Sequence, residues 1–166
     1  AVVEILRTIS IHADKVILHF FCGPASVGYL YAAQRIVNLI QYFIISIRKI
    51  FFPVITENIE KRDNKKVCEL LNKTIFTLLF ILLPVVMFLS IYSKQIIILI
   101  AGSEFKESYI ILVMLSIALV FQGIGLMFSS VIVGSGDNYL YRQIGVVIYS
   151  FTIILNLFLV PDSLFG

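Results

Sequence analysis

The stretch ELLNKTIFTLLFILLPVVMFLSIY, residues 69–92, decides the fold class of this chain. After Lys73 it contains no charged side chain. About 20 consecutive, mostly apolar residues are what a helix needs to cross a bilayer. Similar apolar segments precede and follow it, so we predict membrane-spanning helices over residues 1–22, 26–53, 69–92, 108–133 and 140–160.

The composition of the whole chain supports the same fold class. Of its 166 residues, 60% are hydrophobic and only 14% are charged. A soluble domain has about 45–50% apolar and about 25% charged residues, and a domain of this size cannot bury such an excess. Strands that span a membrane would alternate in polarity, which these segments do not. The predicted fold is therefore an all-α integral membrane protein.

Polar or turn-forming residues separate the predicted helices. Pro84 lies inside the third helix and should kink it. The short apolar segment 93–101 is too short to span a membrane, and we expect it to lie at the interface or to extend the third helix. The breaks are a turn at Gly23-Pro24-Ala25-Ser26, a charged loop at 57–66, a polar segment at 102–107 and a turn cluster at 134–138.

The distribution of basic residues predicts the orientation. The loop 57–66 holds Lys61, Arg62, Lys65 and Lys66, whereas the turn after the first helix carries no charge. Short loops rich in Lys and Arg stay in the cytoplasm. The loop 57–66 is therefore predicted to be cytoplasmic, the first helix to start inside and the fifth to end outside. Cys22 and Cys68 then lie near opposite faces, and no disulfide is expected between them.

The first two helices each carry a polar face. A charge near the bilayer centre costs several kcal/mol, so these faces should line protein or water rather than lipid. We predict a water-filled, net-positive cavity, suited to an anionic head group such as a diphosphate, because Arg offers a fork of donors to phosphate oxygens. The basic residues form no dense patch of the kind that binds nucleic acid. The candidate cavity-lining residues are Arg7, Asp14, Lys15, Arg35, Asn38, Gln41 and Arg48.

Two interpretations stay open for some of these residues. Asp14 and Arg35 fall at a similar predicted depth on neighbouring helices, so they could form an ion pair, which would serve either the cavity or helix packing alone. His12 and His19 could act in a proton relay or be hydrogen-bonded lining residues. Small and polar residues of the fourth and fifth helices, such as Ser130, are expected to serve helix packing.

Motifs of enzymes are missing. The sequence has no Gly-rich phosphate loop that ends in Lys-Ser or Lys-Thr, no Cys/His set with zinc spacing and no Gly-x-Ser-x-Gly elbow. We therefore predict no catalytic residue, no metal and no cofactor, and a transporter rather than an enzyme. The alternative from another class is a fragment of a membrane-embedded glycosyl- or acyltransferase that uses His12 or Asp14.

Several short segments, in order along the chain, carry a resemblance to a known family. The chain resembles the polysaccharide flippases, including those of O-antigen, within the multidrug/oligosaccharidyl-lipid/polysaccharide exporter superfamily. The matching segments are Ala13-Asp14-Lys15-Val16-Ile17-Leu18, Val27-Gly28-Tyr29-Leu30-Tyr31-Ala32-Ala33-Gln34-Arg35-Ile36, Phe52-Pro53-Val54-Ile55-Thr56-Glu57, Leu99-Ile100-Ala101-Gly102-Ser103-Glu104-Phe105 and Leu155-Asn156-Leu157-Phe158-Leu159-Val160-Pro161.

The resemblance implies that the chain is a fragment, helices seven to eleven of a two-lobed transporter, with part of its C-terminal lobe present and its N-terminal lobe absent. It implies a flippase of a bacterial or archaeal inner membrane that moves undecaprenyl-diphosphate-linked oligosaccharide outward by alternating access. Expected partners are this lipid-linked substrate, membrane lipids and the missing lobe. The alternative within the superfamily is a cation-coupled multidrug exporter, which would favour an acidic and aromatic cavity.

Overall fold

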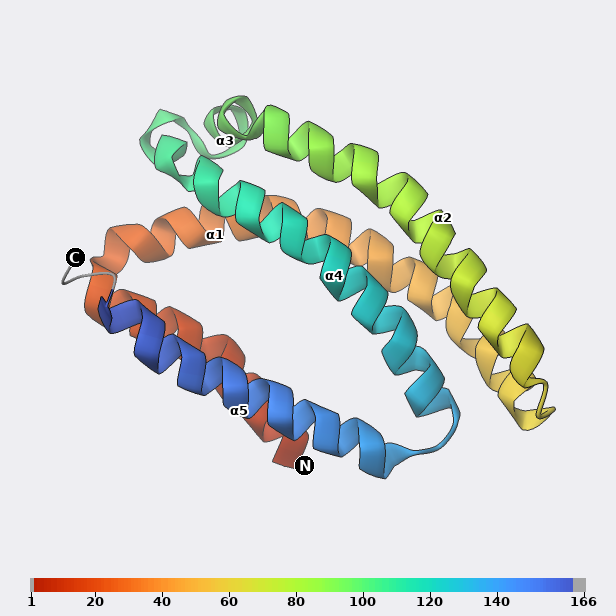
Figure 1. The fold of residues 1–166 in the computed structure, drawn as a ribbon. Helices are drawn as coiled ribbons and strands as arrows, with labels where there is room; N and C mark the ends of the chain where they lie inside the picture. The colour runs from red at the N-terminus through yellow and green to blue at the C-terminus, as the bar shows by residue number, and fades with distance from the viewer. Residues whose placement is uncertain (1, 163–166) are drawn as a thin grey trace. The chain divides into compact units, whose positions relative to one another are not determined.

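The computed structural model describes the backbone of residues 2–162 and the side chains of residues 26–137, 139–152 and 154. The described backbone is helical throughout, apart from short turns, and contains no strand (Figure 1). This confirms the predicted all-α fold class. The elements are α1 (Val2–Glu60), α2 (Asn64–Ile91), α3 (Ser93–Ala101), the 3-10 helix η1 (Ser103–Ser108), α4 (Tyr109–Gly134) and α5 (Asn138–Asp162).

Helix α1 differs from the prediction near its middle. The backbone is helical across Gly23-Pro24-Ala25-Ser26, where the sequence predicted a turn. A proline removes one hydrogen bond of a helix but does not by itself force the backbone out of helical conformation. Pro84 likewise lies inside α2, which continues past it. The separate spans 1–22 and 26–53 stay predictions.

The connection between α1 and α2 is shorter than the predicted loop 57–66. Only Lys61, Arg62 and Asp63 lie between the two helices. The Asp63 amide donates to the Asn58 carbonyl at 3.1 Å and the Arg62 amide to the Ile59 carbonyl at 2.9 Å. This pair of bonds is the Schellman pattern that ends a helix. The Asp63 side chain then caps α2 by accepting a hydrogen bond from the Lys66 amide at 3.1 Å.

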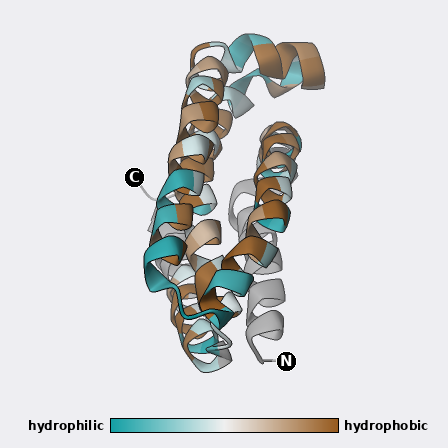
Figure 2. Cartoon of the chain, turned by 90° about the vertical axis from the view of Figure 1, so that its right-hand side faces the viewer, coloured by the Kyte–Doolittle hydropathy of each residue, from teal (hydrophilic) through white to brown (hydrophobic). Residues whose placement is uncertain are grey.

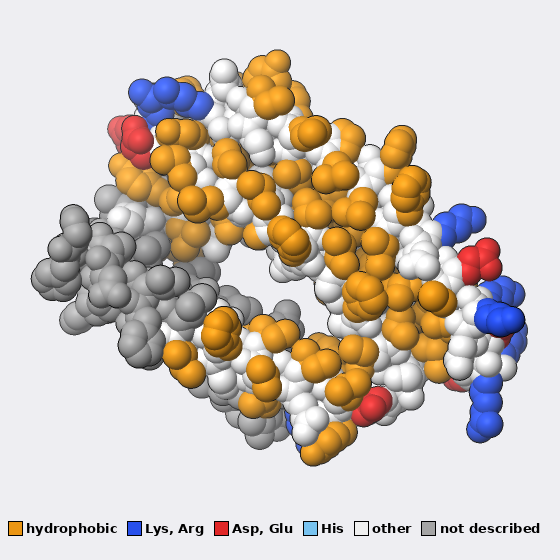
Figure 3. Space-filling view, in the orientation of Figure 1, with side chains coloured by type: hydrophobic (Ala, Val, Ile, Leu, Met, Phe, Trp, Pro, Cys, Tyr) orange, Lys and Arg blue, Asp and Glu red, His pale blue; other side chains and the backbone are white. Residues whose placement is uncertain are grey.

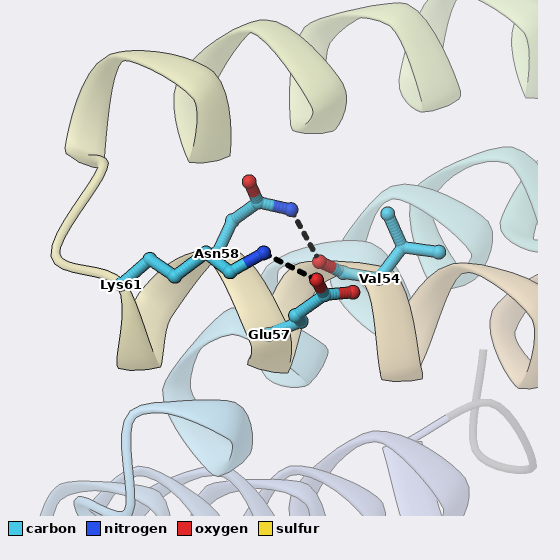
Figure 4. Close-up of polar contacts among 4 residues, drawn as sticks. All are labelled: Val54, Glu57, Asn58 and Lys61. Carbon is cyan, nitrogen blue, oxygen red and sulfur yellow. Dashed lines mark hydrogen bonds and ion pairs between the residues drawn. The ribbon is translucent and has the colours of Figure 1, made fainter.

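Side-chain contacts also stabilise this end of α1. The Asn58 side chain is almost fully buried and donates to the Val54 carbonyl at 2.7 Å, while Lys61 pairs with Glu57 one turn earlier (Figure 4). The hydrogen bond to Glu57, together with the carboxylate charge, holds the pKa of Lys61 above its ordinary value. Lys61 therefore stays charged through the neutral pH range, and its small contribution would be lost only as the pH rises through that raised pKa.

The chain divides into two compact units. The larger is Tyr29–Asp137, and the smaller combines the two ends of the chain. In the larger unit, the second part of α1 packs with α2, α3 and α4 around one apolar core. Its fully buried side chains include Ile44 from α1, Leu78 from α2, Ile97 from α3 and Leu119 from α4. Because one side of α1 packs into this core, the opposite side faces away from the bundle.

Two glycines let α4 approach its neighbours closely. A Cβ atom on Gly123 would lie 2.8 Å from Cδ2 of Leu78 and 3.7 Å from Cγ2 of Ile44. A Cβ on Gly134 would lie 3.1 Å from the Thr56 hydroxyl and 3.2 Å from Ile59. Small residues at such crossings are typical of helix packing in membranes. We expected small residues of the fourth helix, residues 108–133, to serve helix packing, and Gly123 does so. Gly134 lies just beyond that predicted helix.

The outer surface of the larger unit is apolar between two charged ends. Phe76, Phe80 and Met87 of α2 are each more than 60% exposed. Hydrophobic side chains cover much of the visible face, and most Lys, Arg, Asp and Glu side chains gather at its ends (Figure 3). Among the described residues, three segments are long and apolar enough to cross a membrane: Ser26–Glu60, Asn64–Ile91 and Ser103–Gly134.

The end of the larger unit opposite the α1–α2 turn is closed by α3 and η1. Helix α2 stops at Ile91 and a separate helix begins at Ser93, so the segment 93–101 does not simply extend the third span. Tyr29 of α1 packs edge-to-face on Phe105 with ring centroids 6.2 Å apart. Helix α3 carries both hydrophilic and hydrophobic residues, as the colouring by hydropathy shows (Figure 2). The segment joins the end of α2 to the start of α4 and contacts α1 at Tyr29.

Candidate substrate face of helix α1

Between Tyr29 and Phe52, α1 has three distinct faces. The first is buried against α2 and α4 and includes Ala33, Ile44 and Phe51. The second is apolar and exposed, with Leu39 68% and Ile50 75% exposed. A helix that crosses a bilayer beside partners needs both faces, one for packing and one for lipid.

The third face is polar, and we call it the α1 polar face. Gln34, Asn38, Gln41 and Arg48 recur at helical spacing, which places them on one side of the helix next to the buried face, and Arg35 lies at the outer margin of this side, toward the exposed face. Arg35 and Asn38 are exposed, whereas Gln34, Gln41 and Arg48 are partly buried. The α1 polar face comprises Gln34, Arg35, Asn38, Gln41 and Arg48.

Arg48 is fixed to another helix of the bundle. Its Nε donates to the Ser130 hydroxyl of α4 at 3.0 Å. Ser130 is fully buried, and its own hydroxyl donates to the Leu126 carbonyl one turn earlier at 2.8 Å. Because a hydroxyl has one proton to donate, Ser130 meets Arg48 as an acceptor. The polar face is thus tied to the packed core at this one point.

Arg35 lies at the other end of the polar face. It is 13 residues before Arg48, which corresponds to about 20 Å along a helix. No hydrogen bond or ion pair joins Arg35 to another side chain within the part of the chain that the structure describes. The face therefore carries Arg35 and Arg48 near its two ends, with Lys49 beside it, and no carboxylate between them.

The structure brings together only the second-helix candidates. Asn38, Gln41 and Arg48 fall on one face of α1 and Arg35 falls at its margin, while their role in a cavity stays a prediction. The side chains of the first-span candidates lie outside the described residues, so the Asp14–Arg35 pair and the histidine relay stay predictions. These first-span candidates are Arg7, His12, Asp14, Lys15 and His19.

Sequence reasoning missed the partner of Arg48. Ser130 was assigned to packing, because serine is common wherever membrane helices approach each other. The depth of the two residues in the membrane would have indicated this hydrogen bond. Arg48 lies five residues before the predicted inner end of the second span, and Ser130 lies three residues before that of the fourth. Two polar residues at matching depth on packed helices are a natural hydrogen-bonding pair.

Comparison with known proteins adds the family. The family model described as lipid II flippase MurJ matches residues 9–162, nearly the whole chain. The chain belongs to the MurJ family. No curated protein and no solved structure gives a significant match.

Membership of the MurJ family settles the general class of function. The chain belongs to a multi-pass membrane transporter for lipid-linked precursors, and not to an enzyme. The transferase alternative is thereby set aside. The resemblance to lipid-linked sugar flippases is confirmed at this level, whereas the O-antigen flippases are not the group that the family model identifies.

Proposed function

We propose that this protein moves a polyprenyl-diphosphate-linked sugar of the lipid II class across the cell membrane, and that the α1 polar face lines part of its path. The observation that supports this most directly is the cationic, carboxylate-free polar face on an apolar helix of a MurJ-family chain. Its two arginines match the charge of a diphosphate, and guanidinium groups bind phosphate oxygens in pairs.

The neighbouring faces of α1 fit an amphiphilic substrate. The apolar exposed face, with Leu39 and Ile50, lies on the same helix as the polar face. A lipid-linked sugar carries a polar head and a long hydrocarbon tail, and the tail need not leave the bilayer while the head crosses. The head group would follow the polar face, and the tail would stay in lipid beside the apolar one.

Further parts of the site are proposals that rest on the sequence. Arg7, Asp14 and Lys15 would contribute to the same cavity from the first span, with Asp14 paired to Arg35. His12 and His19 would take part in a proton relay if the transport cycle is driven by protons. A second lobe of the same transporter would close the cavity, so that the substrate meets one side of the membrane at a time.

A second substrate shares the same chemistry. An undecaprenyl-diphosphate-linked oligosaccharide for O-antigen export presents the same diphosphate, and differs from lipid II in the group that the diphosphate carries. The segments that resemble polysaccharide flippases favour it, whereas the family match favours lipid II. A cation-coupled drug exporter is less well supported, because the described polar face contains no acidic residue.

The experiment is a flipping assay on the full-length protein in proteoliposomes. Fluorescent lipid II and a fluorescent undecaprenyl-diphosphate oligosaccharide are compared, and a membrane-impermeant quencher reports the fraction that has crossed. We expect lipid II to cross, and Arg35→Gln to slow it at least tenfold. Lys73→Gln, which removes an exposed cation of α2, is the matched control and should leave the rate unchanged.

The outcomes separate the candidates. Transport of the oligosaccharide lipid but not of lipid II would assign the protein to the polysaccharide branch. Transport of neither lipid, by a protein that is folded and correctly inserted, would refute the proposed function. If Arg35→Gln and Lys73→Gln change the transport rate equally, the α1 polar face does not line the substrate path.

A further inference from the structure

The Arg48 guanidinium uses only part of its hydrogen-bonding capacity within the described residues. A guanidinium has five N–H donors. One of them, on Nε, is bound by Ser130 of α4. No carboxylate of the described residues forms an ion pair with Arg48, and no further hydrogen bond joins it to them. Four donors of a partly buried cation are therefore available to a partner from outside the bundle.

A packing role alone does not explain an arginine here. A neutral amide side chain could donate one hydrogen bond to Ser130 and tie α1 to α4 equally well. A permanent charge within an apolar span needs an anion or water to offset its desolvation. The helix instead places this charge on the same face as Gln41, which lies two turns earlier, where a solvated anionic group would pass.

Ser130 also fixes how the guanidinium is turned. Its proton is committed to the Leu126 carbonyl at 2.8 Å, so only its lone pairs face Arg48. Its complete burial prevents solvent from replacing it. With Nε held at 3.0 Å, the planar group is left with its two terminal amino groups, the pair that forms a fork on phosphate oxygens.

We propose that Ser130 is a positioning residue that orients Arg48 to bind the substrate diphosphate near the cytoplasmic end of the α1 polar face. This rests on the proposed function and adds a loading position to it. Arg48 lies about 20 Å nearer than Arg35 to the turn at Lys61–Asp63. A head group that enters from the cytoplasmic side would meet Arg48 first and Arg35 later.

The test uses the full-length protein in detergent, with farnesyl diphosphate as a soluble probe and farnesyl monophosphate as its comparison. Ser130→Ala is compared with Ser116→Ala. Both serines are fully buried on α4 and donate to the carbonyl four residues earlier, but only Ser130 accepts from an arginine. We expect Ser130→Ala to weaken diphosphate binding about tenfold, and Ser116→Ala to leave it unchanged.

Two further readouts distinguish positioning from packing. The preference for diphosphate over monophosphate should fall in Ser130→Ala, while its melting temperature stays close to that of Ser116→Ala. Arg48→Lys keeps the charge but removes Nε, so it should weaken binding similarly. Combining Arg48→Lys with Ser130→Ala should then cost little more than either change alone, because both act through one contact.

Each possible result has one meaning. If the unaltered protein binds the diphosphate and Ser130→Ala binds it equally tightly, the positioning role is refuted while the proposed function stands. Additive effects of Arg48→Lys and Ser130→Ala would refute it as well. If the unaltered protein binds neither probe but transports lipid II, the loading role of Arg48 is refuted while the proposed function stands, and if it transports neither lipid, the proposed function fails and the inference fails with it.

Discussion

Single residues on α4 set how closely the helices of the larger unit approach each other. Gly123→Ala would place a methyl group 2.8 Å from Leu78, whereas Gly125, two residues later, has no atom within 4 Å of its would-be Cβ. We expect Gly123→Ala to lower the free energy of unfolding by about 1–2 kcal/mol through overpacking. Gly125→Ala should be neutral or raise it by up to about 1 kcal/mol, because alanine favours helix. Thermal unfolding of the full-length protein in detergent measures both.

The Gly123 prediction has a clear failure. The nearest atom is the end of the Leu78 side chain, which can rotate more easily than backbone. If Gly123→Ala and Gly125→Ala unfold at the same temperature, Leu78 has moved without cost and the α2–α4 crossing is looser than it is in the structure.

Ser108 is a fully buried polar residue at the start of α4 whose hydroxyl lacks a hydrogen-bond partner among the described residues. An unpaired buried hydroxyl costs free energy that an apolar side chain avoids. We expect Ser108→Ala to raise the free energy of unfolding by about 1 kcal/mol. A lower melting temperature for Ser108→Ala would show instead that the hydroxyl serves a partner in the native membrane.

Among the elements, the α1–α2 turn contains the one described non-glycine residue in the left-handed region. Arg62 has a φ of +56° at the position where a helix end usually has glycine. The left-handed conformation costs a non-glycine residue about 1–2 kcal/mol. Arg62→Gly should therefore raise the free energy of unfolding by about 1 kcal/mol, measured by thermal unfolding.

A matched control is Lys65→Gly. Lys65 is also basic and exposed, but it lies in the first turn of α2 with helical backbone. Glycine there should lower stability by up to about 1 kcal/mol, because it is a poor helix former. Opposite signs for the two variants would verify the backbone conformation of the turn, and equal signs would contradict it.

The elements that sequence predicted well are those bounded by clear changes of polarity. The predicted spans 69–92 and 108–133 became Asn64–Ile91 and Tyr109–Gly134, because long uncharged runs end at charged or glycine-containing turns. The backbone at Gly23-Pro24 is helical, since turn-forming residues in a membrane span can stay helical, and the separate spans on either side stay predictions. The loop 57–66 was too long, because the Arg62 conformation and the Asp63 cap depend on backbone geometry that composition does not reveal.

The sequence predicted which residues share a side of α1, but it did not predict their contacts, and their role in a substrate site stays a prediction. Helical spacing alone placed Asn38, Gln41 and Arg48 on one face and Arg35 at its margin. The Arg48–Ser130 hydrogen bond joins residues 82 positions apart, and it depends on which face of α4 packs against α1. That choice is made by close contacts such as those at Gly123 and Gly134, which no local pattern specifies.

At the scale of the molecule, the larger unit has the dimensions of a membrane-spanning body. Helix α2 has 28 residues, about 42 Å of helix, whereas the hydrocarbon core of a bilayer is about 30 Å thick. The turn at Lys61–Asp63 lies at one end of this helix, and α3 with η1 lies at the other (Figure 1). Both ends carry charged, exposed side chains. A bilayer around the unit therefore leaves these two ends in water on opposite sides.

The orientation of α2 in the membrane can be tested by labelling single cysteines at its two ends. Single cysteines are introduced as Lys65→Cys and Glu104→Cys, both at exposed positions, in the full-length protein with its other cysteines removed. A membrane-impermeant maleimide applied to intact cells should label Glu104→Cys and spare Lys65→Cys, which should react only after permeabilisation. The reason is that Lys61 and Arg62 of the turn and Lys66 in the first turn of α2 are expected on the cytoplasmic side, because short segments rich in Lys and Arg stay there. Labelling of both positions from outside would show that α2 does not cross the membrane. The reverse pattern would invert the topology, and would place Arg48 at the exit of the substrate path instead of at its entrance.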